Sequence, residues 1–141
     1  MNSSALRSIC VAGLAFVVSA APLSAQGYRA ENRIHVNPLA GNVFEVIEGR
    51  GYGARGMWCA AADYAKDVLR APGTSRLYVH TARGPSITQP GRKAAAFTLD
   101  PTGLTPSGAM IVTISVRTPG ANLSVDHAYS FCADARLINR G

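Results

Sequence analysis

No stretch of this 141-residue sequence is apolar over a length that would cross a membrane. The main apolar run, residues 9–20, has 12 residues, whereas a membrane-spanning helix needs about 20. Arg7 precedes the run and small residues follow it, which is the layout of a secretory signal peptide with a cleavage site after Ala25. We therefore expect residues 1–25 to be a signal peptide, in preference to a retained anchor helix. Residues 26–141 are expected to form a single small exported domain, periplasmic or extracellular.

Acidic residues are few, and no block of like charge occurs. The chain has 14 Lys and Arg against 8 Asp and Glu, and its net charge of +6 falls to +5 when Arg7 leaves with the signal peptide. Scattered arginines are typical of a solvated surface, so no nucleic-acid partner is expected. The positive balance favours weak attraction to anionic components of the cell envelope at low salt. The preference for arginine over lysine fits a bacterial protein.

Cysteine is scarce as well, with three residues in the whole chain. Cys10 lies in the predicted signal peptide, which leaves Cys59 and Cys132 in the exported domain. An even number of cysteines in an oxidising compartment predicts a disulfide, so we expect a Cys59–Cys132 bridge rather than two free thiols. Closing a loop of roughly 70 residues, this bridge would contribute about 4 kcal/mol in the chain-entropy model.

Helical periodicity is confined to one clear segment. In residues 58–71 the apolar side chains recur at steps of three and four, and a Pro-Gly pair follows. Strands are predicted at residues 42–48, 76–82, 94–100 and 109–118, where β-branched and aromatic residues dominate or alternate with polar ones. The expected fold class is α+β, with one α-helix packed on an antiparallel sheet of about five strands and stapled by one disulfide.

The last segment of the chain fits two structures. Val125, His127, Tyr129 and Phe131 alternate with polar or small residues as in a strand, but the same segment suits a helix with Ser124 as its N-cap. The short turn before residue 123 favours the strand, paired with residues 109–118 as an antiparallel hairpin.

Residues 51–56 match the pattern G-x-G-x-x-G just ahead of the predicted helix. A dinucleotide site also needs a parallel βαβ unit and an acidic residue about 20 positions further on, and this chain offers neither. The glycines instead predict a tight, exposed loop at residues 49–56. A narrower hypothesis stays open, in which Arg50, Arg55 and Gly53 hold an anion at the helix N-terminus.

The stretch "MWCAAADYA", residues 57–65, resembles the "WCAAF"-type segment of papain-like cysteine amidases that act on cell-wall peptide, the CHAP group among them. In that family the cysteine opens a helix, and a histidine on a later strand activates it. The resemblance implies Cys59 as nucleophile and His127, or else His80, as base. Because Cys132 is available to oxidise Cys59, the disulfide and the hydrolase are competing expectations.

The three histidines, His35, His80 and His127, are far apart, and none forms a metal-binding pair such as H-x-x-x-H. We therefore predict no metal site and no cofactor. The sequence favours a non-catalytic binding or interaction module of unknown ligand. The alternatives are a cysteine hydrolase acting on cell-wall peptide and an anion-binding module that uses residues 49–56.

Expression with export in a bacterial host tests the predicted signal peptide. We expect the intact mass of the exported protein to correspond to residues 26–141, because cleavage follows the small residue Ala25. A full-length mass recovered with the membrane fraction would contradict this prediction and identify an anchor helix.

Overall fold

The computed structural model describes residues 27–108 and 114–139, which form a seven-stranded sheet and three helices. The strands are β1 (Tyr28–Arg29), β2 (His35–Pro38), β3 (Val43–Ile47), β4 (Arg76–Pro85), β5 (Lys93–Thr98), β6 (Ser107–Gly108) and β7 (Ala121–Ser124). The helices are α1 (Gly53–Asp67), α2 (Val125–Ser130) and α3 (Cys132–Ile138). The expected α+β fold class is thus confirmed.

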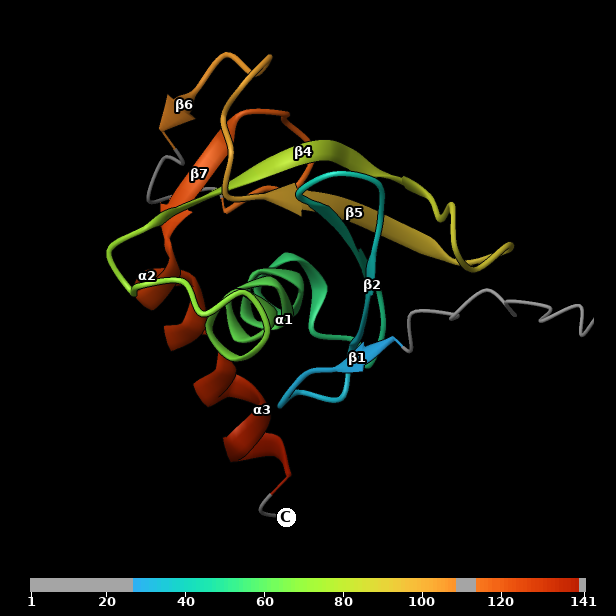
Figure 1. Cartoon of the computed structure of the whole chain (residues 1–141). Helices are drawn as coiled ribbons and strands as arrows, with labels where there is room; N and C mark the ends of the chain where they lie inside the picture. The colour runs from blue at the N-terminus through green and yellow to red at the C-terminus, as the bar shows by residue number, and fades with distance from the viewer. Residues whose placement is uncertain (1–26, 109–113, 140–141) are drawn as a thin grey trace, which may run out of the picture.

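The sheet has the order β1-β2-β3-β5-β4-β7-β6 and curves around α1 (Figure 1). Neighbouring strands are antiparallel, except that β6 and β7 are parallel. The helices α2 and α3 pack beside α1 near the β7 end of the sheet. None of the helices in the described ranges is both long and apolar enough to cross a membrane.

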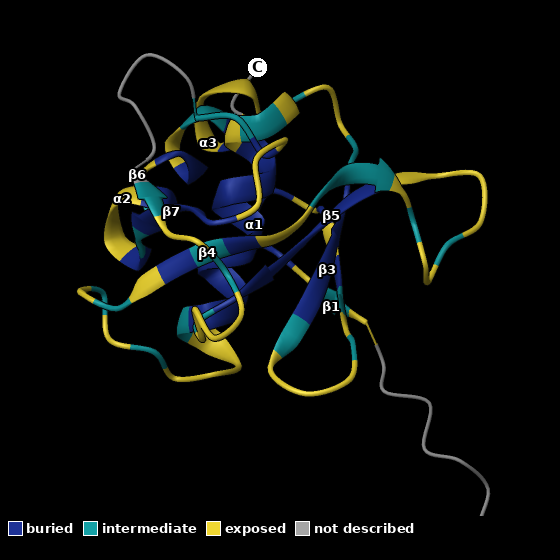
Figure 2. Ribbon diagram, turned by 90° about the horizontal axis from the view of Figure 1, so that it is seen from above, coloured by how far each residue is buried: buried dark blue, intermediate teal, exposed yellow. Residues whose placement is uncertain are grey.

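The core lies between α1 and the concave face of the sheet, as the dark-blue segments of Figure 2 show. The rings of Trp58 and Phe97 meet edge to face with centroids 5.1 Å apart, and both side chains are fully buried. The Trp58 indole also donates a hydrogen bond to the carbonyl of Ile114 at 3.0 Å. Alanines fill much of the rest of α1, which favours the helix and lets neighbouring elements approach closely. The helix therefore forms the centre of the domain.

The Cys59–Cys132 disulfide is present and joins the middle of α1 to the first residue of α3. Both cysteines are completely buried. The bridge spans 73 positions of the sequence and ties the C-terminal helices to the core helix. This confirms the expected staple, although its second end lies on a helix and not on a strand.

The strand expected at residues 123–132 is wrong beyond Ser124, where β7 ends. The Ser124 hydroxyl accepts a hydrogen bond from the His127 amide at 3.2 Å and caps α2, the alternative that the sequence had left open. Of the partner strand expected at residues 109–118, residues 109–113 lie outside the described ranges and residues 114–118 form no strand. The helical solution places Val125, Ala128 and Cys132 in the core.

The first helix also differs from its predicted bounds of 58–71, since α1 begins at Gly53 and ends at Asp67. Residues 53–56, the second half of the predicted glycine-rich loop, therefore form the first turn of α1. The helix stops before Pro72 because Arg70 has a left-handed backbone with φ of 56°, and the Ala71 amide bonds back to the Ala65 carbonyl at 2.8 Å. The strands β3, β4 and β5 match the predicted ones closely, whereas β1 and β2 were not predicted.

Removing the disulfide tests how much it contributes to the unfolding free energy. We expect the double variant Cys59→Ala/Cys132→Ala to lose about 4 kcal/mol of unfolding free energy, because an unfolded chain without the 73-residue cross-link gains that entropy. Urea unfolding of both proteins measures the difference. A loss below about 1 kcal/mol would contradict a stabilising role for the bridge.

Candidate anion-binding cleft

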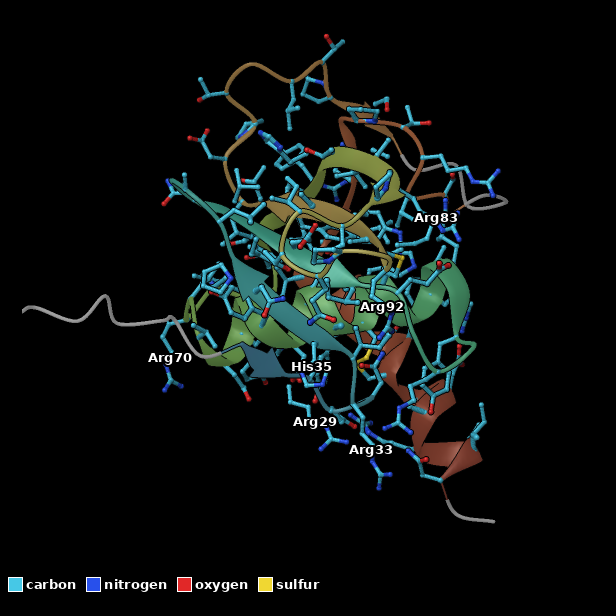
Figure 3. The ribbon with its side chains drawn as sticks, turned by 90° about the vertical axis from the view of Figure 1, so that its right-hand side faces the viewer. Arg29, Arg33, His35, Arg70, Arg83 and Arg92 are labelled. Carbon is cyan, nitrogen blue, oxygen red and sulfur yellow. A yellow bond between two sulfur atoms is a disulfide. The ribbon has the colours of Figure 1, made fainter. Side chains whose placement is uncertain are left out.

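A small cleft of about 200 Å³ opens where β3 ends and the chain turns toward α1. Three arginines from separate loops line it, together with one histidine. The cleft is lined by Arg33, Ile34, His35, Ile47, Gly49, Arg50 and Arg92. Figure 3 shows Arg33, His35 and Arg92 on one side of the molecule, together with Arg29.

The turn between β1 and β2 fixes the position of Arg33. Its backbone is left-handed, with φ of 64°, and its amide donates to the Ala30 carbonyl at 2.7 Å. The neighbouring Asn32 is buried and anchors the turn to α1 by donating from Nδ2 to the Gly56 carbonyl at 2.8 Å. The turn that carries Arg33 is therefore tied to the first part of the core helix.

The other two arginines of the cleft come from two different loops. Arg50 follows β3 and has a left-handed backbone with φ of 62°, a conformation that is uncommon for a residue with a side chain. Arg92 precedes β5, and its Nη2 donates to the Glu48 carbonyl at 2.9 Å. A Cβ atom on Gly49 would lie 3.5 Å from that Nη2, so the Arg92 side chain lies close against the backbone of the cleft.

No acidic residue lines the cleft, and the nearest ones along the chain have other partners. The Glu48 carboxylate takes two hydrogen bonds from Arg83, at 2.9 and 2.6 Å. Burial alone would raise the pKa of the Glu45 carboxyl, but hydrogen bonds from Thr88, Ile87 and Ser86 hold that pKa below its ordinary value. Glu45 is thus an ionised anchor for the loop between β4 and β5.

The positive charge of the cleft is therefore not neutralised within the described part of the chain. The described residues form four ion pairs, whose cations are Arg55, Lys66, Arg83 and Arg136. None of the cleft arginines takes part in one. Arg29 adds a further cation at the edge, because it is the direct cross-strand neighbour of His35 in the pairing of β1 with β2.

The structure separates the two arginines of the predicted anion loop. Arg50 lines the cleft, but Arg55 bonds Asp134 on α3 through two contacts of 2.6 and 3.0 Å, and its guanidinium stacks on the Phe131 ring at 4.4 Å. Gly53 is the first residue of α1, with φ of 60°, and does not line the cleft either. Arg55 therefore joins α1 to α3, while Arg50 acts with residues from other loops.

Sequence reasoning missed Arg33, His35 and Arg92 as partners of Arg50. They lie 17, 15 and 42 positions away from Arg50 along the sequence, and no local pattern links them. Only a weak signal pointed to these residues as cleft partners, because Arg33 and Arg92 each lie within one or two residues of a turn. Only the sheet register brings these three loops together.

The structure does not assemble the cysteine-hydrolase site. The Cys59 sulfur is bonded to Cys132 and fully buried, so it has no thiolate to act as a nucleophile. His127 is an exposed residue of α2 whose ring lies against Phe131, with centroids 5.5 Å apart. His80 is exposed on β4 and contacts the Thr81 hydroxyl at 2.9 Å. Within residues 27–108 and 114–139, no three His, Cys, Asp or Glu side chains converge as a metal site.

A second group of polar residues fixes the N-terminal segment to the core helix. The Tyr28 hydroxyl donates to Asp63 at 2.9 Å and to Asp67 at 3.1 Å, and the Glu31 amide donates to Asp63 at 2.7 Å. Burial raises the pKa of the Asp63 carboxyl above its ordinary value, and the two hydrogen bonds offset this only in part. The group holds β1 against α1 and thereby supports the turn that carries Arg33.

The raised pKa of Asp63 gives a pH-dependent prediction. A carboxyl whose folded-state pKa exceeds its unfolded value contributes its full stability below the unfolded pKa, and loses that contribution as the pH rises through the folded pKa. Asp63→Asn keeps an acceptor for both hydrogen bonds but carries no charge. We therefore expect its unfolding free energy to improve relative to wild type as the pH rises above about 4, the ordinary pKa of an unfolded aspartate, and to level off above the raised pKa of the folded state.

Urea unfolding at several pH values measures this difference, and Asp63→Ala is the control. The alanine variant loses both accepted hydrogen bonds and should be less stable than Asp63→Asn throughout. A stability difference between Asp63→Asn and wild type that stays constant, or that shifts in favour of wild type as the pH rises, would contradict the buried-charge interpretation.

Comparison of the chain with protein-family models, with curated proteins and with solved structures finds no match. The function is therefore argued from the geometry of the cleft and its surroundings.

Proposed function

We propose that this protein is an exported, non-catalytic binding module that recognises an anionic group through the cleft formed by Arg33, His35, Arg50 and Arg92. The observation that carries the proposal is that three arginines from separate loops line one cleft and that no carboxylate lines it. Guanidinium groups donate several hydrogen bonds in a fixed geometry that matches phosphate, sulfate and carboxylate oxygens. The cleft thus offers donors and positive charge without a lining carboxylate.

The size of the cleft supports a small recognition element. Pockets for whole drug-sized ligands have volumes of about 300–1,000 Å³, whereas this cleft has about 200 Å³. A single oxyanion group fits this scale better than an entire cofactor. The ligand can then be a larger anionic molecule of the cell envelope that presents one such group.

Backbone strain at two of the arginines is a further support. Left-handed backbone at a residue with a side chain costs of order 1 kcal/mol and persists where the surrounding structure enforces it, often at ligand-binding sites. Arg33 and Arg50 both have this conformation, and both line the same cleft. The Asn32 anchor and the Arg92 contact to Glu48 hold the loops in place before any ligand arrives.

Export is supported by two independent features. The N-terminal layout of a charge, a short apolar run and small residues predicts a signal peptide. The buried Cys59–Cys132 disulfide suits an oxidising compartment such as the periplasm. The same disulfide favours a binding role over the hydrolase alternative, because it occupies the only candidate nucleophile that the sequence suggested.

Titration with inorganic phosphate tests the cleft. We expect phosphate to shift the NMR amide signals of residues 49 and 50, and the variant Arg33→Gln/Arg50→Gln to bind phosphate at least about tenfold more weakly. The reason is that each lost charge-assisted hydrogen bond is worth about 1.5–3 kcal/mol. Wild-type affinity should fall as sodium chloride is raised, since salt screens the attraction.

The matched control is Arg70→Gln/Arg117→Gln, which removes the same charge from exposed arginines outside the cleft. Arg70 shares the left-handed backbone, so the control also includes a substitution at a strained position. Equal weakening in both double variants would reduce the effect to net charge and contradict a specific site. Absence of phosphate binding by the wild type would contradict the proposal itself.

A further inference from the structure

A second and larger pocket lies at the opposite end of β3, near the C-terminal end of α1. Its volume of about 590 Å³ is in the range of small-molecule sites. The turn between β2 and β3 forms one wall, and the residues that follow α1 and β5 form the others. Phe44, Tyr64, Leu69 and Leu99 are among the apolar residues that line it.

The aromatic wall of this pocket is rigid. Phe44 and Tyr64 are almost completely buried, and their ring centroids lie 4.6 Å apart at an angle of 41°. Phe44 is further supported by the stacked Phe97 ring at 6.3 Å. Leu69 is 41% exposed, so an apolar side chain at the rim remains in contact with water when the pocket is empty. An apolar ligand would cover that surface.

The Tyr64 hydroxyl is the polar group that distinguishes this pocket. Tyr64 is only 6% exposed, yet its hydroxyl makes no hydrogen bond to any residue in the described ranges. No fully enclosed polar side-chain atom in the described ranges lacks a partner, so this hydroxyl is open to solvent, and Tyr64 is one of the residues that line the pocket. Burial raises the pKa of Tyr64, so the group stays protonated and is a donor without an acceptor.

The other buried polar side chains in the described ranges do have hydrogen-bond partners. Asn32 donates to Gly56, Thr98 accepts from the Asp100 amide, and Asn122 accepts from Arg76. The Tyr64 hydroxyl differs from these groups because it is open to solvent, and the acceptor atom of a ligand would take the place of solvent there.

The charge at the rim selects the class of ligand. Asp100 is the only charged residue among those that line the pocket. Hydrogen bonds from the Thr102 hydroxyl and amide hold the pKa of Asp100 below its ordinary value, and both go to the same oxygen, Oδ1. The second oxygen accepts no hydrogen bond from the described residues, so it is free for a cation. An anionic ligand would be repelled here.

From the unpartnered Tyr64 hydroxyl, the apolar walls and the Asp100 carboxylate, we infer that this pocket binds a small amphiphilic amine. Such a ligand has a flat apolar body, a hydrogen-bond acceptor for Tyr64 and an ammonium group for Asp100. The site is independent of the anion-binding cleft, which lies at the other end of β3 and has the opposite charge.

Two probes that differ in their charged group test this inference on the exported chain. 4-Methoxyphenethylamine carries an ether acceptor, an aromatic ring and an ammonium group, and 3-(4-methoxyphenyl)propanoate carries a carboxylate in place of the ammonium. NMR titration should give saturable binding of the amine, with shifts of the amide signals of residues 41–44, 99 and 100, and at least about fivefold weaker binding of the acid. Equal affinities, or no binding of the amine, would overturn the inference.

Single-atom changes then assign the two polar contacts. Tyr64→Phe should weaken the amine about threefold to tenfold, because one hydrogen bond is lost while the ring stays. Tyr78→Phe, a half-buried tyrosine outside the pocket, is the matched control and should have no effect. Asp100→Asn should remove most of the preference for the amine over the acid. An unchanged amine affinity in Tyr64→Phe would overturn the assigned hydrogen bond.

The same variants separate this inference from the anion-binding proposal. Tyr64→Phe and Asp100→Asn should leave phosphate binding unchanged, and Arg33→Gln/Arg50→Gln should leave amine binding unchanged. Loss of amine binding in the arginine variant would contradict two independent sites. Each proposal therefore fails or stands on its own probe.

Discussion

Ten consecutive residues of α1, from Gly56 to Ala65, are buried, and the rest of the structure depends on this packing. The curved sheet covers one side of the helix, while α2 and α3 cover another. Trp58 fills the sheet side, and Cys59 fixes the helical side through its bond to Cys132. Both candidate sites are built at the ends of this helix. The Arg33 turn is anchored to Gly56 near its start, and Tyr64 faces the larger pocket near its end.

The parts of the fold that could be predicted are those with a strong local pattern. Residues 42–48, 76–82 and 94–100 are rich in β-branched, aromatic or small apolar residues, and they form β3, β4 and β5. The disulfide followed from compartment and cysteine count. The last segment could not be decided locally, because Val125, Tyr129 and Phe131 fit two periodicities. Its helical state is decided by the Ser124 cap and by the bond from Cys132 to α1.

The candidate site was predictable only in part, because it is a tertiary feature. Arg50 was identified through the glycine-rich loop, but its presumed partner Arg55 is used to hold α3 through Asp134. The partners that the structure supplies, Arg33 and Arg92, come from turns whose proximity depends on β2 and β5 flanking β3. The chain has few acidic residues, and those in the four ion pairs bind cations outside the cleft. The arginines that line the cleft are therefore available to a ligand.

The likeness of residues 57–65 to a cysteine amidase has a structural explanation that needs no catalysis. A tryptophan followed by a cysteine and alanines inside a helix suits any helix that packs deeply against a sheet, because the large ring fills the core and the small residues permit close approach. In an amidase such a cysteine faces a cleft and a histidine. Here the same position faces α3 and finds a second cysteine. The local sequence reflects how the helix packs. Whether the cysteine is a nucleophile or part of a disulfide depends on the residue that faces its sulfur.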